Sequence, residues 1–128
     1  MANLCLLRKD KMGFKFEKLI IWQKAMDLAE EIQELSKKFS NEEVYNLTSQ
    51  IRRAADSIAL NIAEGSIGQT NPEQGRFIGY ALRSLAEVVT CLYKAKRRKY
   101  IEDSEFDKLY SECFNLLNMI IGFKKSIK

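Results

Sequence analysis

Apolar residues recur at intervals of three and four along most of the chain, which is typical of amphipathic helices. Glycine and proline are absent from 14–64 and from 80–121. Such stretches suit helices, because glycine costs about 1 kcal/mol and proline about 3 kcal/mol in a helix interior. Acidic residues near 42 and 103 mark two further helix starts, and Asn71-Pro72 marks another. The pattern predicts four helices, at 17–39, 42–65, 72–99 and 104–126.

Each predicted helix has one apolar face that can form a core. Short connections force consecutive helices to run antiparallel, so the predicted fold class is all-α, an antiparallel up-down-up-down four-helix bundle. We expect residues 1–13 to be a flexible tail, with Met12 as a second candidate start, and 14–128 to be one domain. The predicted core faces are Trp22, Ala25, Met26, Ala29, Ile32 and Ser36; Leu47, Ile51, Ala54, Ile58, Ile62 and Gly65; Phe77, Ala81, Leu85, Val88, Leu92 and Ala95; and Phe106, Leu109, Cys113, Leu116, Leu117 and Ile120.

The second and third predicted helices each carry an additional apolar line beside the core face. A helix in an isolated bundle needs a stripe of only about 100°. Apolar surface in excess of that usually marks a partner site, so we predict self-association. The alternative is that these residues belong to the core of a single bundle. The predicted interface residues are Ala55, Ala59, Ala63, Leu82, Ala86, Val89 and Tyr93.

Composition restricts the chemistry that this chain can perform. It has 128 residues, 46% of them hydrophobic and 30% charged, and contains no histidine. That absence excludes histidine-based triads and histidine metal ligands, and we find no general acid–base constellation. We therefore predict a binding protein rather than an enzyme, without cofactor or metal. No segment approaches the roughly 20 apolar residues of a membrane span, so no membrane partner is expected.

The three cysteines, Cys5, Cys91 and Cys113, are widely spaced and form no C-x-x-C pair. This spacing favours neither a disulfide framework nor a zinc site, and a reducing cytoplasm is the simplest location. In the predicted bundle Cys91 and Cys113 lie almost level with each other. They form either a redox pair or two small core residues, and the second interpretation is preferred because buried free cysteine is ordinary packing.

A polar row lies beside the apolar face of the second predicted helix. Arg53 and Asn61 are suited to tie neighbouring helices, and Asn61 is close enough to the core to need a hydrogen-bond partner. A structural polar seam that fixes helix register is preferred over a catalytic role. The predicted polar seam consists of Gln50, Arg53, Ser57, Asn61 and Glu64.

Basic residues concentrate at the end of the third predicted helix. Cations there also complement the helix dipole, which is the simpler explanation of the run. In an oligomer the cluster would be repeated, and phosphate affinity rises with the number of contacts. Tyr93 and Tyr100 are the aromatic candidates among these charges, too few to indicate sequence-specific reading of single strands. The predicted phosphate-contacting residues are Arg52, Arg53, Lys94, Lys96, Arg97, Arg98 and Lys99.

The order of residues resembles a bacterial four-helix-bundle family. This family includes proteins encoded in intervening sequences of 23S rRNA genes and the accessory variability determinant of diversity-generating retroelements. The resemblance covers about 14–125. It rests on Phe16-Glu17-Lys18-Leu19, Trp22 with Ala25, Gln50-Ile51-Arg52-Arg53-Ala54-Ala55, Ser57-Ile58, Asn61-Ile62-Ala63-Glu64-Gly65, Phe77, and Ser84 with Glu87.

The resemblance implies a four-helix bundle that assembles into a barrel-like homopentamer. For the retroelement members it also implies binding to nucleic acid and to a reverse transcriptase. The segment 66–70 lacks the arginine that is common in the family, and the usual proline before the second helix is absent. The resulting prediction is a non-enzymatic oligomeric scaffold that binds RNA or DNA. Such a scaffold could serve as an accessory to a nucleic-acid enzyme such as a reverse transcriptase. The alternative is a protein-interaction module without nucleic acid.

Overall fold

The computed structural model of the chain describes residues 13–68 and 70–127. Within that part of the chain there are four α-helices, three short 3-10 helices and no strand, which confirms the all-α prediction. Of the predicted tail, only Gly13 is described, and Cys5 lies outside the described residues. The elements are η1 Lys15–Lys18, α2 Ile20–Leu35, η2 Ser36–Lys38, η3 Asn41–Glu43, α3 Leu47–Ile67, α4 Asn71–Arg97 and α5 Asp103–Ser126.

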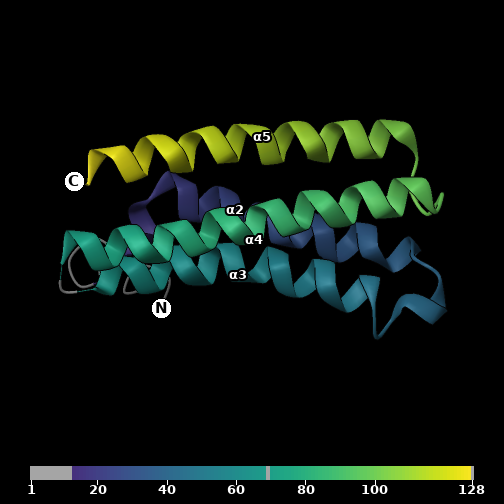
Figure 1. The fold of residues 1–128 in the computed structure, drawn as a ribbon, viewed down its shortest axis with the longest axis horizontal. Helices are drawn as coiled ribbons and strands as arrows, with labels where there is room; N and C mark the ends of the chain where they lie inside the picture. The colour runs from purple at the N-terminus through teal and green to yellow at the C-terminus, as the bar shows by residue number, and fades with distance from the viewer. Residues whose placement is uncertain (1–12, 69, 128) are drawn as a thin grey trace, which may run out of the picture.

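The four α-helices form an antiparallel bundle in which consecutive helices are neighbours (Figure 1). The connections from α2 to α3 and from α4 to α5 lie at one end, and the connection from α3 to α4 lies at the other. The bundle is closed by packing of α5 against α2. Among the described helices, none is both long and apolar enough to cross a membrane.

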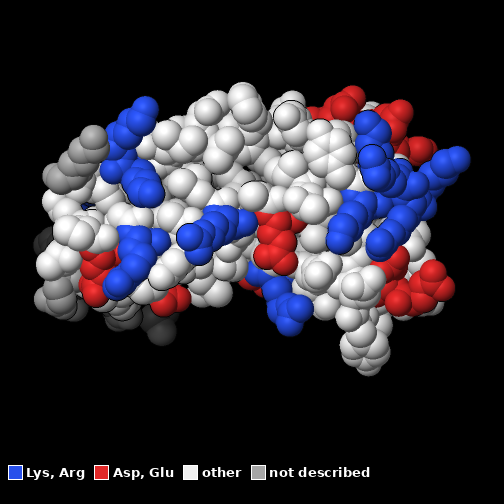
Figure 2. Space-filling view, in the orientation of Figure 1, with Lys and Arg blue, Asp and Glu red and all other residues white. Residues whose placement is uncertain are grey.

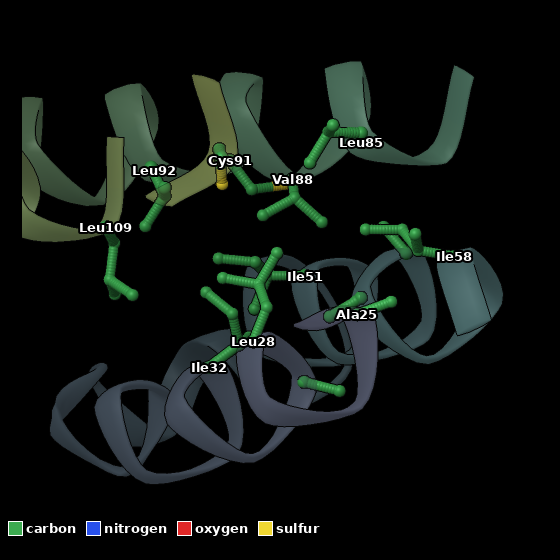
Figure 3. Packing of buried hydrophobic residues seen from close by; sticks show 14 of the residues in the cluster. Ala25, Leu28, Ile32, Ile51, Ile58, Leu85, Val88, Cys91, Leu92 and Leu109 are labelled. Carbon is green, nitrogen blue, oxygen red and sulfur yellow. The ribbon is translucent and has the colours of Figure 1, made fainter. Parts of the chain in front are cut away.

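The interior is filled by the predicted apolar faces of all four helices. Figure 3 shows α4 residues such as Val88 and Leu92 directed toward Ile32 of α2 and Ile51 of α3. Ile32, Ile51, Val88 and Leu92 have no exposed surface. Met26 is a wrong core prediction, since it is 42% exposed. The reason is that α2 is rotated about its axis relative to the prediction, so that residues such as Leu28 and Ile32 lie at the centre of its inner face.

Helix α3 begins five residues later than predicted, at Leu47. The Glu43 carboxylate folds back onto the new helix, and its Oε1 accepts the Leu47 backbone N–H at 3.4 Å. The acidic residues of 42–43 therefore belong to a separate 3-10 helix, η3, which the Ser40 side chain caps. Similarly, η1 replaces the predicted first turn of the first helix, so that α2 begins at Ile20.

The connection between α3 and α4 is shorter than predicted because α3 continues through Gly65 to Ile67. A Cβ atom at Gly65 would lie 3.0 Å from the Cβ atom of Phe77, so glycine permits α3 and α4 to approach closely here. Thr70, not Asn71, is the N-cap of α4, with its Oγ1 accepting the Glu73 N–H at 3.2 Å.

Candidate nucleic-acid interface

Helices α2 and α4 end, and α3 and α5 begin, at the same end of the bundle, which we call the basic pole. Figure 2 shows Lys and Arg gathered over the C-terminal end of α4, with acidic residues at the same end. The negative end of the α4 dipole favours cations at this place. The residues of the cluster are Lys94, Lys96, Arg97, Arg98 and Lys99, and η2 contributes Lys37 and Lys38.

Three cations of the basic pole are exposed and without a carboxylate partner in the described chain: Lys94, Arg97 and Lys99. The Lys96 ammonium lies 4.5 Å from the centroid of the Phe106 ring, which holds it against α5. A cation over an aromatic face keeps its charge, so Lys96 still adds to the positive potential. The pole therefore presents several cations to which phosphates can bind.

Two arginines of the predicted phosphate-contacting set are engaged within the chain. Arg98 Nη1 donates to Glu43 Oε2 at 2.9 Å. Arg52 Nε donates to the buried Ser36 Oγ at 2.7 Å and thereby ties α3 to the end of α2. Arg53 is exposed on α3. The phosphate-contact prediction therefore rests mainly on Arg53, Lys94, Arg97 and Lys99.

Lys99 has a left-handed backbone, with φ at 62°. It follows the C-cap of α4, where the Lys99 N–H bonds to the Lys96 carbonyl and the Tyr100 N–H bonds to the Ala95 carbonyl. This is the Schellman arrangement, in which glycine is the usual residue at the left-handed position. A lysine here costs about 1 kcal/mol relative to glycine.

Glu43 joins three parts of the basic pole, and no motif in the sequence indicates this role. Its Oε2 accepts hydrogen bonds from Tyr100 Oη at 2.7 Å and from Arg98, and its Oε1 accepts from Asn46 Nδ2 at 3.1 Å. The Tyr100 hydrogen bond is the largest of the effects that lower the pKa of Glu43 below its usual range. The same hydrogen bond raises the pKa of Tyr100. The turn before α3 is thus fixed to the end of α4.

The predicted polar seam is only partly formed. Ser57 Oγ and Ser84 Oγ are 2.7 Å apart and link α3 to α4. Asn61 Nδ2 donates to the Ser57 carbonyl and to Ser57 Oγ, each at 2.9 Å, so its partner lies on its own helix rather than on a neighbour. Arg53 and Glu64 are exposed, and Gln50 is half-buried. The prediction that Arg53 ties a neighbouring helix is wrong, because Arg52 has that role.

Aromatic and aliphatic side chains cover the side of the bundle formed by α4 and α5, which we call the outer α4–α5 face. Phe114 is 51% exposed and Tyr93 is 47% exposed. The ring centroids of Tyr93 and Phe106 are 4.8 Å apart, and those of Tyr110 and Phe114 are 6.4 Å apart. Figure 2 shows this face as a broad white surface with basic residues near its two ends. Its exposed residues are Ala86 and Tyr93 of α4 and Tyr110, Phe114 and Ile121 of α5, whereas the predicted interface residues Leu82 and Val89 are half-buried against the core of their own chain.

The predicted interface residues of α3 behave differently from those of α4. Ala55 is 1% exposed and Ala59 is 4% exposed, so the prediction that they form an exposed line is wrong. The reason is that α2 and α4 both pack against α3 and use its apolar surface on two sides. Ala63 is half-buried and lines, with Met26 and Leu60, a hollow on the α2–α3 side.

Two glutamates meet where α2 packs against α5. The pKa of Glu112 is raised to about 7. Burial of the carboxyl is the largest cause, and its hydrogen bond to the Glu31 carboxylate is the next largest. The fold therefore favours the protonated form of the Glu112 carboxyl more than water does. Lys108 Nζ lies 3.7 Å from Glu31 Oε2. Lys24 lines the same surface hollow as the two glutamates. Asp27 and Asn115 also line this hollow.

The two described cysteines are core residues. Cys91 and Cys113 are both buried and unbonded to each other. Burial raises the pKa of Cys113 to about 12 and also raises that of Cys91. Figure 3 places Cys91 between Val88 and Leu92 in the bundle interior. This supports packing over a redox pair, because a thiol with a raised pKa is a poor nucleophile.

A family model described as 23S rRNA-intervening sequence protein matches residues 17–122. The chain belongs to this family. The match covers all four α-helices except the last residues of α5, and it includes the whole basic pole.

A solved structure shows the same fold as this member of the 23S rRNA-intervening sequence protein family. It is a protein of unknown function from the S23 ribosomal protein family of Bacteroides thetaiotaomicron, with a TM-score of 0.76 and 23% identity. The alignment covers 83% of this chain and 99% of that one. No curated protein matches the chain.

Proposed function

We propose that this chain is a non-enzymatic scaffold that self-associates through its outer α4–α5 face and binds RNA or DNA at the basic pole. The observation that carries the proposal is the group of unpaired cations Lys94, Arg97 and Lys99 at the end of α4. Charged groups of one sign without protein partners are suited to phosphate contacts, which position a nucleic acid without reading its bases.

The left-handed Lys99 supports the same proposal. Glycine would relieve the backbone at this position, yet the chain carries a positive charge there. A residue held in a costly conformation leads to a hypothesis of function when its side chain has a use that glycine cannot supply. Contact with phosphate is such a use.

Self-association would repeat the basic pole in every protomer. The homopentamer that the resemblance implies is a ring, and a ring requires two different surfaces to meet at each interface. The outer α4–α5 face would supply one of them. The hollow on the α2–α3 side, which Met26, Leu60 and Ala63 line together with Glu30 and Asp56, is our candidate for the other.

In this proposal the protein partner is a nucleic-acid enzyme such as a reverse transcriptase, to which the oligomer would present bound nucleic acid. The outer α4–α5 face taken by itself also suits the alternative, a protein-interaction module without nucleic acid. The proposed function and this alternative differ in whether the cations of the basic pole are needed for binding a partner.

Fluorescence anisotropy with a labelled RNA hairpin tests the proposal at several salt concentrations. Three phosphate contacts per protomer give a slope of about −2 to −3 in log K against log salt. We expect Lys94→Glu with Arg97→Glu to reduce affinity at least tenfold. Arg98 is left intact, because its reversal would place a second carboxylate beside Glu43. The matched control, Lys15→Glu with Lys18→Glu, makes the same change of charge at the other end of the bundle.

Weak, salt-independent binding by the unmodified chain would contradict the proposal and favour the protein-interaction module. An equal loss in the control variant would show that the overall charge, rather than the basic pole, attracts the RNA. Sedimentation of each variant would confirm that assembly is unchanged.

A further inference from the structure

The start of α4 and the end of α5 lie at the end of the bundle opposite the basic pole (Figure 1). Between them is a hollow of about 520 Å³, within the roughly 300–1,000 Å³ of small-molecule sites. We infer that this hollow binds an anionic amphiphile of the fatty-acid class, with the aliphatic chain inside it and the carboxylate at Lys124 and Lys125. This site is separate from the basic pole and does not depend on nucleic-acid binding there.

The lining of the hollow is mainly apolar. Leu82 of α4 and Ile127 at the end of α5 line it and also pack against the hydrophobic core of the bundle. Ile121 lines it from α5 and is 36% exposed. Within the described part of the chain, no carboxylate side chain lines this hollow. An aliphatic chain that moves from water to such a lining gains free energy from the burial of apolar surface.

Gly75 leaves the α4 side of the hollow open. It lies within α4, where glycine is less stable than alanine. A Cβ atom at Gly75 would meet no heavy atom of another element within 4 Å, so close packing does not require glycine here. Gly65 is the contrast, because a Cβ atom there would lie 3.0 Å from the Cβ atom of Phe77. What glycine provides at position 75 is open volume, because Gly75 lines the hollow.

Two lysines of α5 bring positive charge to the hollow. Lys124 and Lys125 both line it and are exposed, and among the described residues neither forms an ion pair. A Cβ atom at Gly79 would lie 3.7 Å from Lys124 Nζ, so this ammonium reaches from α5 to the surface of α4. The positive end of the α4 dipole lies at the same place. Figure 2 shows basic side chains over the C-terminal end of α5.

The lining favours an aliphatic chain over a nucleotide. A nucleotide carries ring nitrogens and sugar hydroxyls, which need hydrogen-bond partners when they leave water. The side chains of Leu82, Ile121 and Ile127 offer none. A fatty acid is polar only at its carboxylate, which the two lysines can face. A second copy of this chain is the competing occupant, because Ile121 also belongs to the outer α4–α5 face.

Isothermal titration calorimetry with decanoate, at pH 8 and below the critical micelle concentration, tests the inference. We expect one site per protomer. Octanoate should bind about tenfold more weakly, because two fewer methylene groups are buried. Decyltrimethylammonium has the same chain and the opposite charge, and it should also bind about tenfold more weakly than decanoate.

Variants at two glycines locate the bound chain. Gly75→Leu fills the hollow from α4 and should weaken decanoate binding by at least about tenfold. Its thermal melting should stay unchanged or rise, because leucine is the better helix residue. Gly122→Leu is the matched control on α5: a Cβ atom there also has open space around it, and Gly122 does not line the hollow. It should leave the affinity for decanoate unchanged within twofold.

Variants at the two lysines test the place of the carboxylate. Lys124→Gln with Lys125→Gln should weaken decanoate about three- to tenfold and should not weaken decyltrimethylammonium. If this double variant binds decanoate as the unmodified chain does, or if decyltrimethylammonium binds as tightly as decanoate, the lysines do not select an anion and the fatty-acid class is wrong.

Two further results would overturn the site itself. If Gly75→Leu binds decanoate as tightly as Gly122→Leu does, the ligand lies outside the hollow and the inference is wrong. If the unmodified chain does not bind decanoate and Gly75→Leu sediments at a lower mass, a second copy occupies the hollow instead. Neither result bears on the RNA titration, whose variants lie at the basic pole, so failure of this inference is distinguishable from failure of the proposed function.

Discussion

The α2–α3 side and the outer α4–α5 face have similar patterns in the sequence but different surroundings in the bundle. Both sides carry an apolar line in addition to the core face. On α3 the line is made of alanines such as Ala55 and Ala59, and neighbouring helices cover them. On α4 and α5 it contains partly exposed rings such as Tyr93, whose ring meets that of Phe106 edge-on, and Phe114, which is stacked on Tyr110.

This difference goes with residue size at most positions of the two lines, although the small Ala86 of the outer α4–α5 face is exposed. Small residues let a neighbouring helix of the same chain approach, so the chain itself buries them. Large aromatic residues keep the next helix at a distance and stay available to another molecule. An apolar line in a sequence therefore indicates a partner surface more strongly when its residues are large.

The largest expected effect separates the buried interior from the outer face. Ile58→Ala removes a side chain with no exposed surface and should lower the free energy of unfolding by about 2–5 kcal/mol. Phe114→Ala removes a ring that is 51% exposed and should cost less than about 1 kcal/mol. Urea denaturation at submicromolar concentration measures both. Equal losses would mean that the outer α4–α5 face is part of the core.

The contact between α2 and α5 should depend on pH. The folded pKa of Glu112, about 7, lies above its ordinary value of 4.5, so the fold favours the protonated carboxyl. The stability that the protonated Glu112 carboxyl gives to the fold is therefore fully present below pH 4.5 and is lost as the pH rises through 7. Glu112→Gln should remove this dependence and raise stability at pH 8 by about 1–2 kcal/mol, less than the full pKa shift would give because solvent screens this partly exposed carboxyl. The exposed Glu87, changed to Gln, is the control and should leave the pH profile of unfolding unchanged.

The smallest expected effect concerns Lys99. Lys99→Gly should stabilise the fold by about 1 kcal/mol, because glycine adopts the left-handed backbone without strain. Lys99→Ala removes the same charge but keeps a Cβ atom, so its stability should stay close to that of lysine. Both variants should weaken RNA binding equally, because both lose the same charge. The pair of variants therefore separates the effect of the charge on binding from the effect of the backbone on stability. Tighter binding by Lys99→Gly would contradict a phosphate contact at this position.

The helices and most of the core were predictable because both depend on local periodicity. Ile51, Ile58 and Ile62 are fully buried as predicted, since a spacing of three and four places them on one side of a helix. The rotation of α2 was not predictable, because Met26 lies at the edge of its apolar face. Only packing against α3 and α5 decides that Leu28 faces inward.

The basic pole was predictable as a cluster, but its individual roles were not. The sequence places Glu43 in an acidic helix start, and its partners Arg98 and Tyr100 lie 55 and 57 residues away. Arg52 and Arg53 are adjacent in the chain, and only the position of Ser36 decides which of them is engaged.

Sedimentation velocity at about 10 μM, with Phe114→Glu and its control Val44→Glu, tests most directly whether the outer α4–α5 face joins copies of this chain. Val44 is 49% exposed and Phe114 is 51% exposed, so the two changes are matched. We predict that the unmodified chain and Val44→Glu sediment as an oligomer, at about 74 kDa for five protomers of 14.8 kDa, and that Phe114→Glu sediments as a monomer. An unmodified chain that sediments at 14.8 kDa would contradict the account.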